Sequence, residues 1–394
     1  MGYSKRLLFV ITQAEWGGVQ SYVWRAAQEA RQRGFEVLVC AGGTGELEKR
    51  CHESNIPYRR LLRIRRNIAP FADIGAVGEL VGLMREWKPD IAYLHSSKAG
   101  IVGSIAARIA RRAEGGANVP RVVYRIGGWS FLDPVSSVQK AVRRWSEQIS
   151  ARLKDVIIVL HPGDEELAMR YRITPRDRLI MIPNGLDLTA FDASLLPRDE
   201  ARAIVRGVWR NGVPSGATVP ETAPLLLTIA NFYPTKNLTM YLNAISIARK
   251  RIPDLRAIVI GDGEERAALE AKRHALGLDE IVSFPGAHAD ASALLKGAEA
   301  FVLPSAKEGM PWTLLEAMAA ALPCIVTDVG ANRWMIGEAG AVVPPNDPTT
   351  LADAIVRALA DSERARSLGR RARTTVESRF TDRAMWEATF SLFR

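Results

Sequence analysis

The feature that most constrains the fold of this chain is a repeated alternation of short apolar segments with longer segments of helical composition. Short apolar runs bounded by turn residues are typical of buried parallel strands, and strands that alternate with helices form parallel sheets covered on both faces. The runs form two series, at residues 5–12, 35–40, 90–94, 119–126, 156–160 and 179–182, and again at 225–229, 257–260, 281–284, 301–303, 324–327 and 341–343. A chain of 394 residues is too long for one ordinary core. We therefore predict an α/β protein of two doubly wound, Rossmann-like domains that face a central cleft.

The segment between the two series has a different character. Residues 187–223 lack a long apolar period and contain four breakers of regular structure around one helical stretch, namely Pro197, Pro214, Gly216 and Pro220. We interpret this segment as a connection between a first domain at residues 1–186 and a second domain at residues 224–377.

Composition and motifs exclude several classes of function. No apolar run approaches the ~18 residues that a membrane-spanning helix needs. The cysteines, Cys40, Cys51 and Cys324, lack paired spacing, which predicts a reducing cytoplasm and no zinc site. The histidines are scattered and no Asp-x-Asp occurs, so we expect no metal. The chain also lacks the GxGxxG, GxxxxGKS/T and GxSxG patterns of dinucleotide-binding proteins, P-loop proteins and serine hydrolases.

The net charge of +10 lies in the first half of the chain. Residues 1–190 contain 29 Lys and Arg against 19 Asp and Glu, whereas the remaining residues are balanced. Three clusters stand out, which are Arg59, Arg60, Arg63, Arg65 and Arg66; Arg108, Arg111 and Arg112; and Arg143, Arg144, Arg152 and Lys154. Such a surface attracts anionic lipid or a diphosphate-bearing acceptor, but an ordinary solvated face would have the same composition. Aromatic residues do not alternate with these cations, which makes nucleic acid the weakest candidate partner.

Residues 301–321 carry the strongest functional pattern. An apolar strand at 301–303 leads through a loop containing Pro, Ser and Gly into a helix that begins at Trp312. Backbone N–H groups at such a helix start, together with the helix dipole, bind anions. Glu308 in the loop and Glu316 one turn into the helix flank that position, because helical side chains lean toward the N-terminus. The pattern suits the diphosphate and hydroxyls of a nucleotide sugar; the alternative is that Glu308 is solvated and Glu316 lies on a polar helix face.

Lys236 follows the first strand of the second series, at 225–229. A lysine at the C-terminal end of a parallel strand is placed to meet a phosphate, whereas a surface loop is the more common location of lysine. Because Lys236 and the loop of Glu308 follow strands of the same predicted sheet, the functional interpretation is favoured.

Seven motifs in the second half carry a family resemblance. They lie at residues 182–187, 230–237, 261–263, 284–286, 304–318, 322–330 and 340–348. With these motifs the chain resembles the retaining nucleotide-sugar glycosyltransferases of the GT-B fold, specifically glycosyltransferase family four. The first half matches more loosely, through Gly17-Gly18-Val19 and residues 95–100. The spacing of Glu308 and Glu316, with seven residues between them, is the acidic signature of that family.

The resemblance implies a role for each matching residue. Glu308 would contact hydroxyls of the donor sugar, Glu316 the ribose hydroxyls and Lys236 the diphosphate, so Glu308 and Lys236 are the predicted catalytic residues. The segment from Gly309 through Met310 and Pro311 to Trp312 would offer backbone N–H groups to the diphosphate, with help from Gly17 and Gly18 across the cleft. The other predicted donor-binding residues are Asn184, Asn231 and Gly263.

Two positions depart from the family pattern. Asn231 stands where members usually carry an arginine, and an asparagine cannot neutralise a phosphate. Gly127-Gly128 stands where many members have a His-Gly pair. His95 and Arg125 lie on nearby predicted strand ends and could replace that histidine, although a structural role is favoured for each. The predicted acceptor-side residues are His95, Lys98, Arg125, Gly127 and Gly128.

The resemblance predicts transfer of a hexosyl group from a nucleoside diphosphate sugar to a carbohydrate or lipid-linked acceptor, in polysaccharide or cell-envelope glycan assembly. Retention would follow front-face attack, in which the departing phosphate takes the acceptor proton, and no metal or other cofactor is expected. The final segment, 378–394, places Trp386, Phe390 and Phe393 at helical spacing and is expected to pack on the first domain. We expect a cytoplasmic protein at the inner face of an anionic membrane. The alternatives are an epimerase or another enzyme of the same fold, and a catalytically silent subunit that binds sugar nucleotides.

Overall fold

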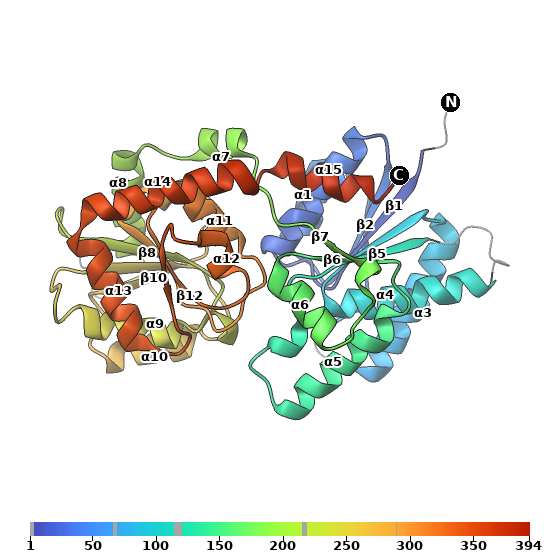
Figure 1. Cartoon of the computed structure of the whole chain (residues 1–394), viewed down its shortest axis with the longest axis horizontal. Coiled ribbons are helices and arrows are strands. Elements are labelled where there is room, and N and C mark those ends of the chain that lie inside the picture. The colour runs from blue at the N-terminus through green and yellow to red at the C-terminus, as the bar shows by residue number, and fades with distance from the viewer. Residues whose placement is uncertain (1–3, 66–68, 114–119, 215–218, 289) are drawn as a thin grey trace. The chain divides into compact units, whose positions relative to one another are not determined.

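The computed structural model describes residues 4–65, 69–113, 120–214, 219–288 and 290–394. The chain forms two compact units, of which the first comprises Met1–Pro183 together with Met385–Arg394 and the second comprises Asn184–Ala384. Each unit is built around one parallel β-sheet covered by helices (Figure 1). The predicted α/β class with two Rossmann-like sheets is confirmed.

The sheet of the first unit contains seven parallel strands, which are β1 (Arg6–Ile11), β2 (Glu36–Gly42), β3 (Tyr58–Leu61), β4 (Ile91–His95), β5 (Arg121–Arg125), β6 (Val156–Val159) and β7 (Leu179–Met181). Their order is β3-β2-β1-β4-β5-β6-β7. The order changes direction between β1 and β4, and ligands of such sheets bind beside this reversal. The edge strand β3 was not predicted, because Arg59 and Arg60 give it an exposed, polar sequence.

Helices cover both faces of this sheet. They are α1 (Gly18–Gln32), α2 (Glu46–Glu53), α3 (Pro70–Trp87), α4 (Ser97–Ala113), α5 (Ser137–Ala151) and α6 (Pro162–Arg170), with short 3-10 turns at η1 (Ser130–Leu132) and η2 (Arg176–Arg178). One core joins strand residues such as Leu8 and Tyr124 to Leu80 of α3, Val102 of α4 and Ala151 of α5. These three helices therefore share one face of the sheet.

The last residues of the chain complete the first unit. The final helix is α15 (Asp382–Ser391). The ring of Trp386 lies 5.3 Å from that of Tyr22, and the ring of Phe393 lies 5.2 Å from that of Tyr93. Phe390 packs against Phe35 in the same way. Aromatic pairs at such distances contribute more packing energy than their buried area alone would give. Residues 385–394 are therefore an integral part of the core of the first unit.

The sheet of the second unit contains six parallel strands, which are β8 (Leu225–Ile229), β9 (Arg256–Ile260), β10 (Val282–Gly286), β11 (Ala300–Leu303), β12 (Cys324–Thr327) and β13 (Ala341–Val343). Their order is β10-β9-β8-β11-β12-β13, so the direction changes between β8 and β11. The other elements are α7 (Leu188–Ser194), α8 (Arg198–Arg210), η3 (Pro234–Lys236), α9 (Leu238–Ala248), α10 (Arg266–Ala275), η4 (Ala291–Gly297), α11 (Trp312–Ala319), α12 (Asn332–Ile336), α13 (Pro348–Ala360) and α14 (Ser362–Arg379).

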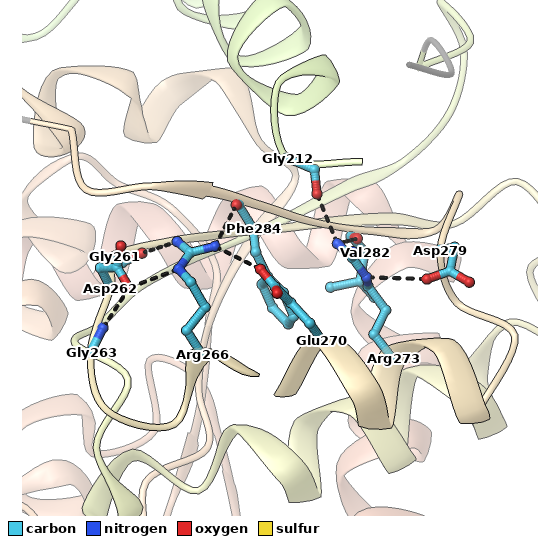
Figure 2. A network of polar contacts seen from close by, with 10 residues as sticks. All are labelled: Gly212, Gly261, Asp262, Gly263, Arg266, Glu270, Arg273, Asp279, Val282 and Phe284. Carbon is cyan, nitrogen blue, oxygen red and sulfur yellow. Dashed lines mark hydrogen bonds and ion pairs between the residues drawn. The ribbon is translucent and has the colours of Figure 1, made fainter. Parts of the chain in front are cut away.

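The segment interpreted as a connection, 187–223, is folded into the second unit. Ala201, Val205 and Trp209 form a buried stripe along α8, and the indole Nε1 of Trp209 donates to the Ala257 carbonyl at 3.2 Å. The following turn is held by α10, because Arg273 donates to the Gly212 carbonyl at 2.7 Å (Figure 2). A helix with an apolar face 100° wide buries it wherever a surface is available, and here that surface is η4 and β10.

Candidate active site

The centre of the candidate site is an ion pair at the reversal point of the second sheet. Lys236 ends the 3-10 turn that follows β8, and Glu308 lies in the loop that follows β11. These two strands are hydrogen-bonded neighbours, so their C-terminal ends meet at one place. The Nζ atom of Lys236 lies 2.6 Å from Oε1 of Glu308, and their side chains are 21% and 8% exposed. The structure thus brings together the two residues that were predicted to be catalytic.

The loop of Glu308 is held by hydrogen bonds from three directions. The hydroxyl of Ser305 donates to Oε1 of Glu308 at 2.6 Å. The hydroxyl of Thr327, at the end of β12, donates to the Ser305 carbonyl at 2.6 Å. The Thr235 carbonyl accepts from the backbone N–H groups of Ala306 and Lys307 at 2.9 and 3.2 Å. The backbone next to Lys236 is therefore joined directly to the backbone next to Glu308.

The turn at Gly330 and Ala331 packs against the same loop. The N–H of Ala331 donates to the Gly309 carbonyl at 2.8 Å. Gly330 has a φ of +54°, and a Cβ atom placed on it would lie 2.4 Å from the Glu308 carbonyl oxygen. This position needs glycine for two separate reasons, the backbone conformation and the close approach of the Glu308 loop.

The start of α11 follows immediately. Pro311 is its N-cap and, within the described residues, no side chain caps this end. The first turn of any α-helix has N–H groups without intrahelical partners, and the helix dipole adds positive potential there. Asn184 fixes the approach to this helix, because its side-chain amide donates to the Met310 carbonyl at 2.7 Å and its backbone N–H contacts the Met310 sulfur at 3.1 Å. Met310 itself is buried, so it anchors the loop rather than lining it.

Glu316 lies in the second turn of α11, four residues after Trp312. Residues with this spacing share one helix face, and both side chains are half-buried. A carboxylate one turn beyond a helix start is suited to accept hydrogen bonds from hydroxyl groups of a molecule whose anionic part occupies that start.

The remaining donor-side candidates in this unit differ in kind. Asn231 is exposed, two residues after the end of β8. Gly263 packs against that loop, since a Cβ atom on it would lie 2.7 Å from the Phe232 carbonyl oxygen. The nearby cation, Arg266, is committed elsewhere: it bonds Asp262 at 2.7 Å and Glu270 at 3.0 Å, and it donates to the Phe284 carbonyl (Figure 2). Arg266 holds this corner of the sheet together and is not available to replace the cation missing at Asn231.

In the first unit, the candidate glycines lie in the loops that follow β1 and β5. Gly17 is the N-cap of α1, which starts at Gly18 after the loop that follows β1. Gly127 is exposed after β5, and a side chain there would meet only Val19 at 3.6 Å among the described neighbours. Gly128 has a φ of +102°. The backbone at Gly127 would therefore accept a larger residue, whereas the backbone at Gly128 favours glycine.

Two of the polar acceptor-side candidates are deeply buried. His95 and Arg125 are 1% and 4% exposed, and the Arg125 guanidinium lies 4.4 Å from the centre of the Tyr22 ring. Burial, and secondly the charge of Arg125, hold the pKa of His95 well below its usual range. Lys98 forms an ion pair with Asp73 at 2.7 Å. Lys98 is therefore paired with a carboxylate, and His95 and Arg125 are buried inside the first unit.

Several cations of the basic clusters in the first unit are neutralised by carboxylates. Arg59 pairs with Glu86 and Arg60 with Glu48. Arg143 pairs with Asp133. Lys154, which was grouped with surface arginines, is wholly buried and bonds Glu147 at 3.1 Å. Arg66 and the side chains of Arg111 and Arg112 lie outside the described part of the chain.

Sequence reasoning missed the residues that hold the loop of Glu308, which are Ser305, Thr327 and Gly330. The Ser-x-x-Glu spacing from Ser305 to Glu308 was a usable signal, since a serine so placed often bonds a side chain or N–H group three residues on. Thr327 and Gly330 lie in the motif at 322–330, but no local pattern links them to the loop of Glu308, because their partners lie more than twenty residues away.

Over the described ranges, none of the helices combines the length and apolar composition needed to cross a bilayer. Within those same ranges no three His, Cys, Asp or Glu side chains gather into a possible metal site.

Comparison with known proteins identifies the family. The family model for a glycosyl transferase 4-like domain matches residues 17–185, and the model for glycosyl transferases group 1 matches residues 223–361. The chain is 30% identical over 301 residues to UDP-Gal:alpha-D-GlcNAc-diphosphoundecaprenol alpha-1,3-galactosyltransferase of Escherichia coli, an alignment that covers 75% of this chain and 73% of that protein. It is 26% identical over 356 residues to phosphatidyl-myo-inositol mannosyltransferase of Mycobacterium leprae, covering 87% and 84% of the two chains.

Solved structures show the same fold. Anabaena HepE in complex with UDP-glucose is similar to this chain with a TM-score of 0.80 at 18% identity, over 98% of this chain and 99% of that one. The two parallel sheets, the two family models and the Escherichia coli relative together place the chain in a single family. The protein is a glycosyltransferase of the GT-B fold, and it belongs to glycosyltransferase family four (glycosyl transferases group 1), which acts on nucleotide sugars.

Proposed function

We propose that this chain transfers a hexosyl group from a uridine diphosphate sugar to a carbohydrate acceptor carried on a lipid diphosphate, with retention of configuration and without a metal. The observation that carries the proposal is the contact of Lys236 with Glu308 on neighbouring strand ends, directly before the start of α11. The Escherichia coli relative is named for UDP-galactose and a diphosphoundecaprenol-linked acceptor, and HepE was solved with UDP-glucose. Those names motivate the choice of substrates for this chain.

When the donor binds, Lys236 and Glu308 would exchange each other for new partners on the donor. In the free protein the Lys236 ammonium and the Glu308 carboxylate neutralise each other. A nucleotide sugar offers each of them a new partner, because its diphosphate attracts the ammonium and its sugar hydroxyls donate to the carboxylate. Glu316 would accept from the ribose hydroxyls one helical turn further along. A nucleotide without the sugar satisfies Lys236 but leaves Glu308 with Ser305 alone and no counter-ion or sugar hydroxyl, so the intact donor should bind more tightly than the nucleoside diphosphate.

The chemical step places negative charge where the site is positive. As the bond between the anomeric carbon and the phosphate oxygen breaks, charge builds on the leaving diphosphate. Lys236 and the N–H groups at the start of α11 stabilise that charge, and fixed groups of this kind lower a barrier more than solvent does. The acceptor oxygen forms its bond on the same face, and its proton passes to the departing phosphate. This route needs no protein base, and the positive groups of the site take the place that a metal would have.

One observation favours a second function, that of a silent subunit that binds sugar nucleotides. Asn231 is exposed at a position where members of the family usually have an arginine, and Arg266 nearby is already bonded to two carboxylates. With one cation fewer, the diphosphate would bind but leave less readily.

Activity of the purified full-length chain separates these functions. The assay offers UDP-glucose, UDP-galactose and UDP-N-acetylglucosamine, each with a synthetic diphosphate-linked N-acetylglucosamine acceptor carrying a short lipid, in the presence of a chelator. We expect one donor to give an α-linked product, identified by its anomeric NMR coupling. Glu308→Gln and Lys236→Ala should each lower kcat at least roughly 100-fold. Donor binding without product from any pair would favour the silent subunit, and wild-type rates in both variants would show that the site is misassigned.

We also propose that the protein acts at the inner face of the membrane, where a lipid-linked acceptor would be found. The first unit, which carries the net positive charge, would receive that acceptor.

A further inference from the structure

Helix α5 carries a row of apolar side chains on its outer face. Val138, Val142, Trp145 and Ile149 are spaced i, i+4, i+7 and i+11, which aligns them on one side of the helix. All four are exposed, Val138 at 74% and Trp145 at 64%. Exposed apolar residues are common singly, but a continuous row that includes a tryptophan marks an interaction surface.

This row is held rigidly in place. The opposite face of α5 is buried, and Glu147 on that face accepts from Lys154 at 3.1 Å and from the hydroxyl of Tyr124 at 3.1 Å. The helix start is fixed by a reciprocal capping pair between Ser136 and Gln139. A helix anchored at its start and along its inner face presents its outer face as a fixed surface.

A basic cavity of about 730 Å³ adjoins the C-terminal half of the row. Its described lining combines apolar side chains with Arg152, Arg172 and Arg178, and includes no carboxylate. Among the residues described, Arg152 and Arg172 form no ion pair, and Arg178 donates only to the Lys154 carbonyl, at 3.5 Å. Arg143 on the same helix is neutralised by Asp133. Three guanidinium groups that converge on one cavity, without a carboxylate partner in the described part of the chain, point instead to an anionic partner.

We propose that the outer face of α5 and this cavity form a docking surface for an anionic bilayer. Tryptophan and aliphatic side chains at this spacing enter the boundary between headgroups and acyl chains, while guanidinium groups bond lipid phosphates at the same depth. A second copy of the chain fits less well, because a symmetric contact would bring the same three arginines toward each other. The docking surface rests on the proposed lipid-linked acceptor for its purpose, but the transfer reaction does not depend on it.

The position of the cavity agrees with this assignment. Arg152 and Arg178 lie just before β6 and β7, so the cavity is at the N-terminal edge of the first sheet. Gly17 and Gly127 follow β1 and β5 at the opposite edge, where ligands of such sheets bind. A bilayer that occupied the cavity would leave those strand ends open.

The test is co-sedimentation of the full-length protein with vesicles. One set contains phosphatidylglycerol and phosphatidylcholine, and the other contains phosphatidylcholine alone. The apolar variant carries Trp145→Ser with Ile149→Ser, and the charge variant carries Arg152→Glu with Arg172→Glu. The matched control carries Arg364→Glu with Arg366→Glu, an equal change of charge at exposed positions on α14. Thermal unfolding and transfer to a water-soluble short-chain acceptor are measured for every variant.

We expect the wild-type protein and the α14 control to bind the anionic vesicles and not the neutral ones. The apolar variant and the charge variant should each lower the partition coefficient by roughly tenfold or more, with an unchanged Tm and unchanged transfer to the soluble acceptor. Wild-type binding by both of these variants, or an equal loss in the α14 control, would overturn the assignment. So would a dimer that dissociates in the apolar variant, since the surface would then belong to a second copy. A failure of vesicle binding alone would count against the docking surface, and a failure of transfer alone would count against the proposed reaction, so the two proposals are tested separately.

Discussion

The Nζ atom of Lys236 lies 2.6 Å from Oε1 of Glu308, so the two groups that we assign to opposite parts of the donor neutralise each other before it arrives. The contact depends on backbone geometry, because the Thr235 carbonyl accepts from two N–H groups of the Glu308 loop. It keeps a nearly buried carboxylate compensated in the free protein, and it keeps both side chains at the place where the diphosphate and the sugar would meet.

The ion pair should contribute measurably to stability. Lys236→Ala leaves the Glu308 carboxylate without its counter-ion, and we expect the free energy of unfolding to fall by about 2 kcal/mol. Adding Glu308→Gln should recover about half of that loss, which a double-mutant cycle in urea would show as coupling. The control pair is Arg333 with Asp328, which is nearly as short at 2.7 Å but much more exposed. Its coupling should be clearly smaller, and equal couplings in the two cycles would contradict the importance given to burial.

Gly330 should be far less tolerant than another glycine with a similar positive φ. Gly330→Ala places a Cβ atom 2.4 Å from the Glu308 carbonyl oxygen, whereas Gly277, which follows α10, has a φ of +63° and no described neighbour within 4 Å of such an atom. We expect Gly277→Ala to cost about 1–2 kcal/mol through backbone strain alone. Gly330→Ala should cost roughly 2 kcal/mol more and should also lower kcat, because the loop of Glu308 must shift. Similar Tm values and kcat values for the two variants would show that the close contact is unimportant.

Asn231→Arg should improve donor binding. The position is exposed after β8, so a longer side chain has room, and a guanidinium adds the charge that asparagine lacks. We expect the Kd for UDP and the KM for the donor to fall by roughly 3–10-fold, with the gain reduced at high salt. Asn231→Gln serves as the control for side-chain length and should change neither constant. If the arginine variant binds UDP no better than the glutamine variant, this position does not face the diphosphate.

Acid should destabilise the first unit through His161. Burial lowers the pKa of His161 to about 4, and its Nδ1 accepts from the Gly163 N–H at 3.2 Å, a bond that protonation of Nδ1 removes. Since the unfolded chain binds this proton with a pKa near 6.5, stability is complete above about pH 6.5 and falls as the pH drops toward 4, by on the order of 3 kcal/mol.

His161→Asn provides the comparison, because its side-chain oxygen can still accept from Gly163. Unfolding in urea between pH 4 and 7 should depend less steeply on pH in this variant. Part of the slope should remain, because burial also lowers the pKa of His95. If the free energy of unfolding depends equally on pH in the wild type and the variant, His161 takes up its proton in the folded state as readily as in the unfolded chain.

The sheets could be predicted because their strands are buried on both faces. Residues 225–229 were predicted and β8 occupies the same residues, and the run at 301–303 lacks only Ala300 of β11. The polar strand β3 could not be found by the same criterion, since Arg59 and Arg60 point away from any core. The helix α8 was found, but its place in the second unit was not, because the breakers around it resemble those of a linker.

The order of the strands predicted which residues of the candidate site lie near one another, but not how they contact each other. Lys236 and Glu308 were expected to approach each other because parallel strands share an edge, yet the direct ion pair depends on loop backbones that no local pattern describes. Burial of His95 and Arg125 was equally hidden, because both stand at the ends of strands, where side chains are often accessible. Tyr22 of α1 covers them from a distant part of the chain.

The aromatic contacts of Trp386, Phe390 and Phe393 have a consequence for how the protein is made. Residues up to Pro183 are synthesised before the second unit, but their core still lacks Met385–Arg394, which follow the whole second unit in the sequence. Until then Tyr22, Phe35 and Tyr93 lack the rings that cover them in the finished molecule. We therefore expect these aromatic rings of the first unit to stay uncovered in a nascent chain until the second unit, which is one continuous stretch, has been synthesised.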